Sequence, residues 1–281
     1  MVENRPWLTY FTHAMLVVGV LLMAFPIYLT FVASTHTLPE ILERPMPVLP
    51  GSHLIENYTA ALTSGVKELG VSVGRMMLNS LIMALGITCG KIFISLLAAF
   101  AIVYFKFRFR MFFFWLIFIT LMLPVEVRIL PTYKVVADLG MLDNYVGLTL
   151  PLIASATATF LFRQVFLAVP DELAEAARID GASPVRFFFD ILVPMTRTNM
   201  AAMFVILFIY GWNQYLWPLL ITTDESMYTI LIGINRMLAV GDDFAEWQVI
   251  MATTMLAMLP PVVVVVSMQR LFVKGLTETE K

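Results

Sequence analysis

Long runs of apolar residues, separated by short polar segments, dominate the chain. A helix needs about 20 apolar residues to cross a bilayer. Runs near that length lie at about 14–33, 76–105, 111–130, 146–166, 200–220 and 249–269. The pattern predicts an all-α, polytopic membrane protein with six transmembrane helices, in which residues 1–281 form a single transmembrane domain.

The first and last runs each carry a feature that bears on this prediction. Run 14–33 is longer than the roughly 7–15-residue apolar core of a signal peptide, and no clear cleavage motif follows it. We therefore expect it to be retained as a helix. Run 249–269 contains Pro260 and Pro261, which predict a kink.

Composition supports a membrane protein and narrows its partners. The chain is 60% apolar and 14% charged, whereas soluble domains carry about a quarter charged residues. The net charge of −2 gives no reason to expect a nucleic-acid partner. Cys89 is the only cysteine, which excludes an intrachain disulfide, and the three histidines lack metal-ligand spacing. We expect no metal and no cofactor.

The distribution of lysine and arginine predicts the orientation. The segment "KFRFR" at 106–110 holds three cations in five residues, so it is expected on the cytoplasmic side. With six spans, both termini then lie on that side, as does segment 170–194. The proline-rich loop 34–75 lies outside and is expected to form an ordered cap or a partner surface.

The stretch after the fourth run predicts a helix, a bend and a second helix. Asp171 is placed to cap the first helix, and Gly181 to end it in a left-handed conformation. Ser183 and Pro184 predict the second start, and Pro194 the second end. Helices of about ten residues need support in water. Either the protein's own membrane domain or a partner supplies it, and the residues alone leave both open.

The stretch "EAARIDGASPVRFFFDILVP" resembles the EAA motif of permease subunits of binding-protein-dependent ABC importers. It lies between the fourth and fifth runs, as in that family. The resemblance implies that segment 170–194 is the coupling segment, which docks in a cleft of a cytoplasmic ATPase. The residues expected to serve this coupling are Glu175, Ala176, Ala177, Asp180, Gly181, Ala182 and Pro194.

Other stretches extend the resemblance over nearly the whole chain. "YGWNQYLWPLL" is similar to the carbohydrate-uptake branch of these permeases, and "FITLMLPVEVRILPT" and "LPLIASATATFLFRQ" to permeases for sn-glycerol-3-phosphate. The resemblance implies an inner-membrane permease for that substrate, with glycerophosphodiesters as further cargo. It also implies a second permease subunit, two copies of an ATPase subunit and a periplasmic binding protein.

Two other functions stay open at this point, a neutral-sugar permease of the same branch and an ion-coupled secondary transporter. We expect no enzyme activity in this chain, because ATP hydrolysis would belong to the separate subunits. "GITCGK" at 86–91 lacks the spacing of a phosphate-binding loop. Its glycines, Gly86 and Gly90, instead predict a close helix–helix contact.

Four polar residues are candidates for the substrate pathway. Arg128 follows a short apolar run, and it either lines the pathway for an anionic phosphate or closes a salt-bridged helix end. Lys91 lies inside the second run, where it either pairs with a carboxylate or carbonyl group or meets substrate. Asn213 and Gln214 lie in the fifth run, and their amides suit either a substrate hydroxyl or a bond between subunits.

Overall fold

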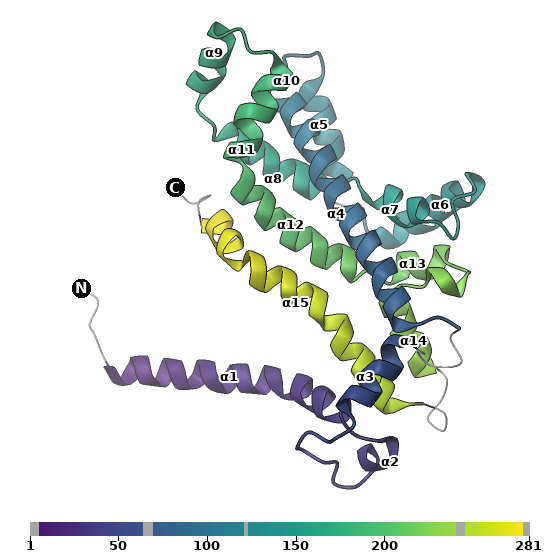
Figure 1. Cartoon of the computed structure of the whole chain (residues 1–281). Coiled ribbons are helices and arrows are strands. Elements are labelled where there is room, and N and C mark those ends of the chain that lie inside the picture. Colours follow the sequence, from purple (N-terminus) through teal and green to yellow (C-terminus); the bar gives the residue numbers. More distant parts are fainter. Residues whose placement is uncertain (1–5, 64–69, 121–122, 240–244, 278–281) are drawn as a thin grey trace. The chain divides into compact units, whose positions relative to one another are not determined.

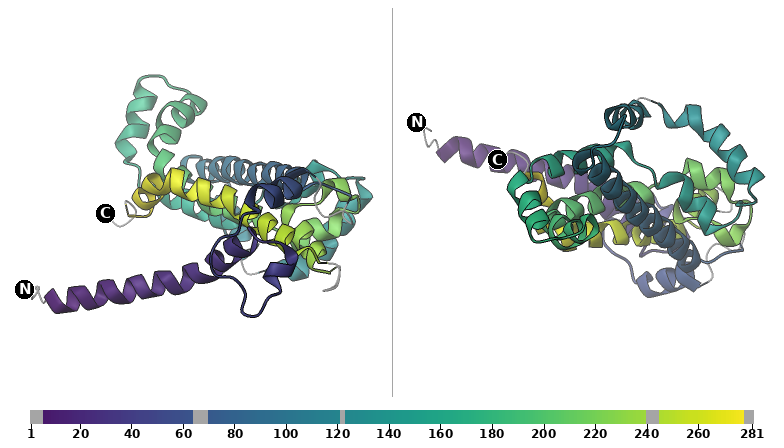
Figure 2. Two further views of the ribbon diagram at one scale, coloured as in Figure 1. Left: turned by 60° about the horizontal axis from the view of Figure 1, so that its bottom comes forward. Right: turned by 90° about the horizontal axis from the view of Figure 1, so that it is seen from above.

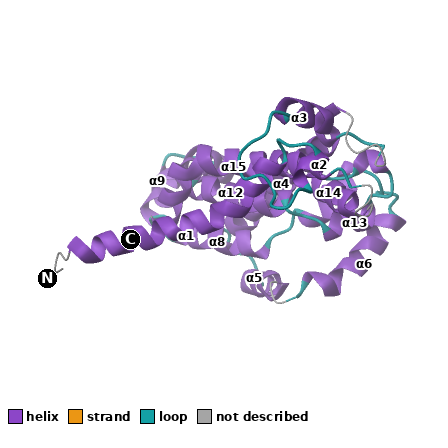
Figure 3. Cartoon of the chain, turned by 90° about the horizontal axis from the view of Figure 1, so that it is seen from below, coloured by secondary structure: helices purple, strands orange, loops and turns teal. Residues whose placement is uncertain are grey.

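The computed structural model describes residues 6–63, 70–120, 123–239 and 245–277. Helices form nearly all of the regular structure in these ranges, and no strand occurs in them (Figure 3). The predicted all-α class is thereby confirmed. The chain divides into two compact units, the first made of 1–75 with 233–258 and the second of 76–232 with 259–281.

Three described helices are long and apolar enough to cross a membrane. They cover Trp7–Ala33, Val73–Tyr104 and Trp247–Arg270. Two further pairs of helices are apolar enough only when taken together across a bend, Tyr145–Leu152 with Ala156–Leu167 at 52° and Pro184–Met195 with Arg197–Trp212 at 73°, and each is a broken span or a re-entrant loop. The predicted count of six also requires a short helix at Arg110–Ile119, so this count stays a prediction.

In the first unit, a hydrogen-bonded loop follows a long apolar helix. Helix α1 (Pro6–Ala33) leads into the short α2 (Leu38–Ile41) and then α3 (Leu54–Thr63) (Figure 1). The side-chain amide of Asn57 donates to the carbonyl oxygens of Ser34 and His36, at 2.9 Å each. The first described part of loop 34–75, residues 34–63, is therefore ordered. Whether it binds a partner stays a prediction.

A close backbone approach in this loop requires a glycine. The N–H of Gly51 donates to the hydroxyl of Thr35 at 2.7 Å. A Cβ atom at position 51 would lie 2.6 Å from the carbonyl oxygen of Thr35 and 2.8 Å from Nδ1 of His36. Any side chain there would push the two segments of the loop apart.

Three helices contain residues of both units: α4 (Val73–Tyr104), α14 (Ile230–Ala239) and α15 (Trp247–Thr277). Pro260 and Pro261 lie inside α15, and the predicted kink at these residues stays a prediction.

The remaining elements belong to the second unit. They are α5 (Arg110–Ile119), α6 (Val125–Asp138), α7 (Tyr145–Thr149), η3 (Leu150–Leu152), α8 (Ala156–Leu167), α9 (Asp171–Ile179), α10 (Pro184–Phe187), the π-helical turn η4 (Phe188–Leu192), α11 (Val193–Met195), α12 (Arg197–Trp212), α13 (Leu216–Ile221) and η5 (Glu225–Met227).

Two apolar clusters hold the second unit together, one at each end of its part of α4. Ile92, Leu96 and Phe100 of α4 pack with Phe162 of α8 and Phe188 of η4. Toward the other end, Met83 and Ile87 pack with residues of α6, α7 and α13. In Figure 1, α9 and α10 lie near the first of these ends and α6, α7 and α13 gather near the other.

Buried polar groups of α4 fix the chain that precedes α14. The side-chain amide of Asn79 donates to the carbonyl oxygens of Ser226 and Tyr228, at 2.8 and 2.9 Å. Its side-chain oxygen accepts from the hydroxyl of Tyr145 at 2.7 Å. The side-chain nitrogen and oxygen of this buried amide therefore both have hydrogen-bond partners. The amide stabilises this specific contact, because no polar atom of its side chain is left unsatisfied.

The two glycines of "GITCGK" lie where another segment approaches α4 closely. A Cβ atom at Gly86 would lie 2.8 Å from Cγ2 of Thr149, and one at Gly90 would lie 2.5 Å from Cγ2 of Ile153. The predicted close contact at these positions is confirmed. It joins α4 to the bend between α7 and α8.

Runs 111–130 and 200–220 are each interrupted rather than continuous helices. In the first, α6 starts after Pro124, its N-cap. In the second, α12 ends at Trp212 and α13 starts at Leu216. Pro218 has no N–H for the carbonyl of Gln214, and its ring would clash with that carbonyl in a continuous helix. Proline chemistry accounts for this second break.

Candidate functional site

Helix α9 opens segment 170–194, the predicted coupling segment, and the charged residues at its two ends are placed favourably for the helix dipole. Asp171 and Glu172 lie in its first turn and Arg178 in its last, an arrangement that stabilises the helix. The predicted capping role of Asp171 is wrong. Pro170 holds the N-cap position, with no side-chain cap bond, and Asp171 is the first helical residue.

A Schellman turn at Gly181 ends α9. The φ angle of Gly181 is +70°, a left-handed conformation that glycine adopts at least cost. The N–H of Gly181 donates to the carbonyl of Arg178 at 3.1 Å, and that of Ala182 to the carbonyl of Ala177 at 2.9 Å. These two bonds are those of the Schellman motif. The predicted left-handed helix end is confirmed.

The second helix starts as predicted but ends later. The hydroxyl of Ser183 accepts from the N–H of Arg186 at 3.2 Å, and Pro184 takes the first helical position. The prediction that Pro194 ends the helix is wrong. The chain stays helical to Met195, through the π-helical turn η4. A π-helical turn widens the helix locally, so we attribute the tolerance of Pro194 to it.

The coupling segment has one face packed on its own protein and one exposed face. Ala177 is buried in the apolar cluster of α4 and α8, with Ala174 and Ala182 packed against that cluster. Glu175 and Ala176 are exposed, and Ile179 is 85% exposed. The protein's own membrane domain therefore supports the segment, and Glu175, Ala176, Ile179 and the exposed Asp180 remain accessible to a partner.

Aromatic rings connect the coupling segment to the end of α4. The ring centroids of Tyr104 and Phe187 lie 5.2 Å apart, and those of Phe100 and Phe188 lie 4.9 Å apart. The hydroxyl of Tyr104 donates to the carbonyl of Phe166 at 3.3 Å. We call Phe100, Tyr104, Phe187 and Phe188 the aromatic joint.

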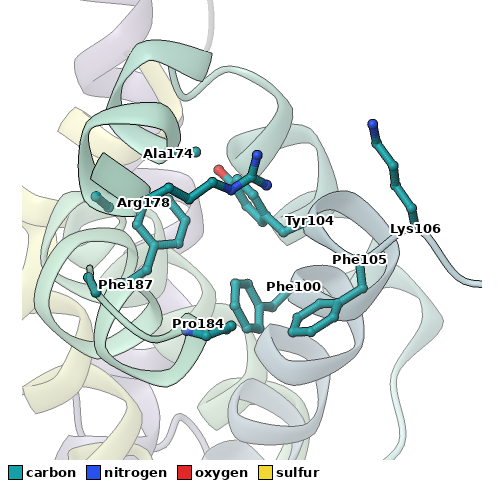
Figure 4. A pocket seen from close by; sticks show the side chains of 10 residues that line it. Phe100, Tyr104, Phe105, Lys106, Ala174, Arg178, Pro184 and Phe187 are labelled. Atoms are coloured by element: carbon teal, nitrogen blue, oxygen red, sulfur yellow. The ribbon is translucent and has the colours of Figure 1, made fainter. Parts of the chain in front are cut away.

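A cavity of about 430 Å³ lies between the aromatic joint and α9 (Figure 4). In Figure 4 the side chain of Arg178 extends from α9 toward Tyr104, and Lys106, which follows α4, also lines the cavity. Figure 2 shows α9 and α10 standing out from the neighbouring helices of the second unit. The coupling segment therefore contacts this end of α4 through the aromatic joint, and the cavity leaves free volume next to that contact.

Two of the candidate pathway residues, Lys91 and Gln214, meet at Tyr210 of the second unit. Lys91 is only 6% exposed, and its Nζ lies 3.7 Å from the centroid of the Tyr210 ring. The side-chain amide of Gln214 donates to the carbonyl of Tyr210 at 3.1 Å. Asn213 is exposed and caps the C-terminus of α12. Arg128 is exposed on α6, and its positive charge acts on Lys91.

Sequence reasoning missed Tyr210 as a partner of Lys91. Its only signal was its place in "YGWNQY", four residues before Gln214. A helical separation of four places the two residues on one face, but nothing in the sequence brings that face to α4. Gly211 explains the approach, because a Cβ atom there would lie 3.0 Å from the Cα of Ala84.

Comparison with known proteins defines the class of this molecule. Residues 91–278 match the family of binding-protein-dependent transport system inner membrane components. The chain belongs to this family. It is thus a membrane-embedded permease component of an ABC importer, a transport subunit rather than an enzyme, as predicted.

Relatives with known names are similar over their whole length. The chain is 62% identical to the sn-glycerol-3-phosphate transport system permease protein UgpE of Agrobacterium fabrum (strain C58), with 100% of both chains covered. It is 60% identical to UgpE of Rhizobium meliloti (strain 1021) and 58% identical to UgpE of Escherichia coli O6:K15:H31 (strain 536), again over 100% of each.

A solved structure shares the fold. It is the crystal structure of a bacterial ABC transporter involved in the import of the acidic polysaccharide alginate. The TM-score is 0.83 at 18% identity, with 96% of this chain and 98% of that chain covered. The permease fold predicted from the sequence is confirmed by this similarity.

Proposed function

We propose that this chain is the permease subunit of an ATP-driven importer that carries sn-glycerol-3-phosphate, and also glycerophosphodiesters, across the bacterial inner membrane. The observation that carries the proposal is full-length identity of 58 to 62% with permeases named for that substrate. Family membership favours this function over an ion-coupled secondary transporter.

The proposed assembly has four kinds of subunit. This chain pairs with a second permease subunit to form the membrane pathway. Two copies of a cytoplasmic ATPase subunit supply the energy, and a periplasmic binding protein delivers the substrate. Both termini of this chain lie in the cytoplasm, as the cations of segment 106–110 indicate.

Coupling follows from the two faces of segment 170–194. The exposed face, with Glu175, Ala176 and Asp180, docks in a cleft of the ATPase. The opposite face, with Ala177 and the aromatic joint, transmits the movement of the ATPase to α4. ATP binding and hydrolysis thereby switch the pathway between its inward-facing and outward-facing states.

The function is tested by assembling the importer in liposomes and measuring binding-protein-dependent uptake of sn-glycerol-3-phosphate. A neutral disaccharide serves as the competing substrate. Uptake of the phosphate ester, unaffected by excess disaccharide, supports the proposal. Efficient uptake of the disaccharide instead would identify the neutral-sugar alternative.

A matched pair of variants tests the coupling segment. Proline fixes φ near −65° and removes an N–H, so Gly181→Pro breaks the turn that ends α9 and should abolish both ATPase co-purification and uptake. Gly140 has the same motif at the end of α6, with φ +66° and bonds from Gly140 to Ala137 and from Met141 to Val136. Gly140→Pro should leave ATPase co-purification intact. Equal ATPase binding by both variants would contradict the proposed role of segment 170–194.

A further inference from the structure

Lys91 is a charged side chain buried inside a membrane-spanning helix. It lies in α4 and is 6% exposed. A buried charge is costly unless it is paired, and intramembrane charges are rare and usually mark a pathway or a partner. Its ammonium rests on the face of the Tyr210 ring, 3.7 Å from the centroid. A ring face supplies only part of the stabilisation that a counter-ion gives.

No counter-ion for Lys91 is found in the described part of the chain. Helices α4, α8 and α12 contain no aspartate or glutamate. Among the described side chains, no carboxylate oxygen lies within 4.0 Å of its Nζ. Arg128 instead adds a second positive charge nearby. The surroundings of Lys91 therefore hold positive charge without a described carboxylate to balance it.

A hydrogen-bonding side chain, Gln214, meets the same Tyr210 as Lys91. Gln214 uses its amide N–H to reach the carbonyl of Tyr210, which leaves its side-chain oxygen as an acceptor. Asn213, the next residue toward α12, is exposed. Side-chain amides of this kind suit hydroxyl groups. Lys91 and Gln214, which both contact Tyr210, match the two ends of a polyol phosphate, with a cation for the phosphate and an amide for a hydroxyl group.

We propose that the ammonium of Lys91 receives the phosphate group of the transported ester, with Arg128 as the second cation and Gln214 and Asn213 facing the hydroxyl end. The ring of Tyr210 holds the ammonium while the pathway is empty. A phosphate oxygen then replaces the ring as its main partner, since a charge-assisted bond is stronger than a ring contact. This inference rests on the proposed function.

The site selects its cargo by charge. A phosphomonoester carries about −1.5 to −2 charges at neutral pH, because its second pKa is about 6. A phosphodiester carries a single negative charge and a sugar none. Loss of Lys91 should therefore lower transport of the monoester more than that of the diester. A merely structural role of Lys91 would lower both equally.

The experiment uses the complete importer in liposomes, with sn-glycerol-3-phosphate and a glycerophosphodiester as the two substrates. For Lys91→Met we expect uptake of the monoester to fall about tenfold or more, and uptake of the diester to fall less. Lys91→Arg keeps the charge and should preserve the ratio of the two rates. ATP hydrolysis stimulated by the loaded binding protein should persist in both variants, which shows that they assemble.

Two further variants serve as controls for the substitutions at Lys91. Lys134 is 75% exposed and paired with Asp138 at 3.0 Å, so Lys134→Met is the matched control and should transport normally. The side chain of Glu126 lies outside the described ones, and Glu126→Gln tests it as a counter-ion of Lys91.

The outcomes separate this inference from the proposed function. An unchanged substrate ratio in Lys91→Met, or an equal loss in Glu126→Gln, overturns the assignment of Lys91 while wild-type uptake upholds the proposed function. If the wild-type importer transports neither phosphate ester, the proposed function itself fails.

Discussion

At the scale of single residues, Glu40 shows what holds the loop at 34–63 in place. One of its carboxylate oxygens accepts from the backbone N–H of Thr37 at 2.8 Å and lies 3.1 Å from Nδ1 of His36. The bond from the Thr37 backbone, that from the Thr37 side chain and that from His36 lower the pKa of Glu40 from 4.5 to about 2. The ionised carboxylate is thus the form that the folded loop prefers.

This lowered pKa predicts how the loop responds to acid. Because the folded pKa lies below the unfolded one, the contribution of Glu40 to stability is complete above about pH 4.5 and is lost as the pH falls toward 2. Glu40→Gln should weaken the loop at neutral pH. Hydrogen exchange of peptides covering 35–50, compared between wild type and variant at one pH, measures this.

The control is the neighbouring exposed Glu43, because Glu43→Gln should leave exchange in the same peptides unchanged. Wild-type exchange in Glu40→Gln at neutral pH would contradict the role of Glu40. The expected difference between wild type and Glu40→Gln narrows in acid, since protonation removes the same charge as the substitution.

At the scale of elements, the packing of α4 on the bend between α7 and α8 depends on two positions without side chains. Gly90→Val would place a branched side chain against Ile153. Overpacking of this kind typically costs about 1–3 kcal/mol. We expect a lower unfolding temperature of the detergent-solubilised subunit and less assembled importer.

Gly19 in α1 provides the comparison, since a Cβ atom there has no neighbour within 4 Å in the described structure. Gly19→Val should unfold at nearly the wild-type temperature. A fall in unfolding temperature as large as that of Gly90→Val would mean that valine in a helix, rather than the contact with Ile153, is responsible.

Local chemistry made some elements predictable from the sequence. The turn at Gly181 and the helix start at Ser183 depend on a few neighbouring residues, and both were predicted correctly. The end at Pro194 was predicted wrongly because the π-helical turn before it depends on packing rather than on a local signal. The break near Asn213 was missed although Pro218 signals it.

The candidate site was predictable by residue type but not by partner. A lysine within an apolar run is conspicuous in a sequence, and so is an amide pair among aromatic residues. That Lys91 meets the ring of Tyr210, rather than a carboxylate, follows from how α12 crosses α4 at Gly211. Such contacts between distant segments leave no periodic pattern in the sequence.

At the scale of the whole molecule, α4 connects the proposed substrate site to the coupling segment. Lys91 and Tyr104 lie on this one helix, about 20 Å apart at 1.5 Å per residue. Both residues belong to the second unit. A movement of the coupling segment therefore reaches the neighbourhood of Lys91 through a single rigid element, provided that the aromatic joint transmits it.

The last prediction concerns this joint. Tyr104→Leu removes the ring that contacts Phe187 and Phe166 but leaves the exposed face of α9 unchanged. We expect ATPase co-purification to persist, while the number of ATP molecules hydrolysed per substrate imported rises severalfold. Tyr104→Phe keeps the ring and loses only the 3.3 Å bond to the carbonyl of Phe166, so its ratio should stay near that of wild type. If Tyr104→Leu instead hydrolyses as many ATP molecules per imported substrate as wild type, the movement reaches α4 by another route. The packing of Phe100 on Phe188 then becomes the next contact to remove.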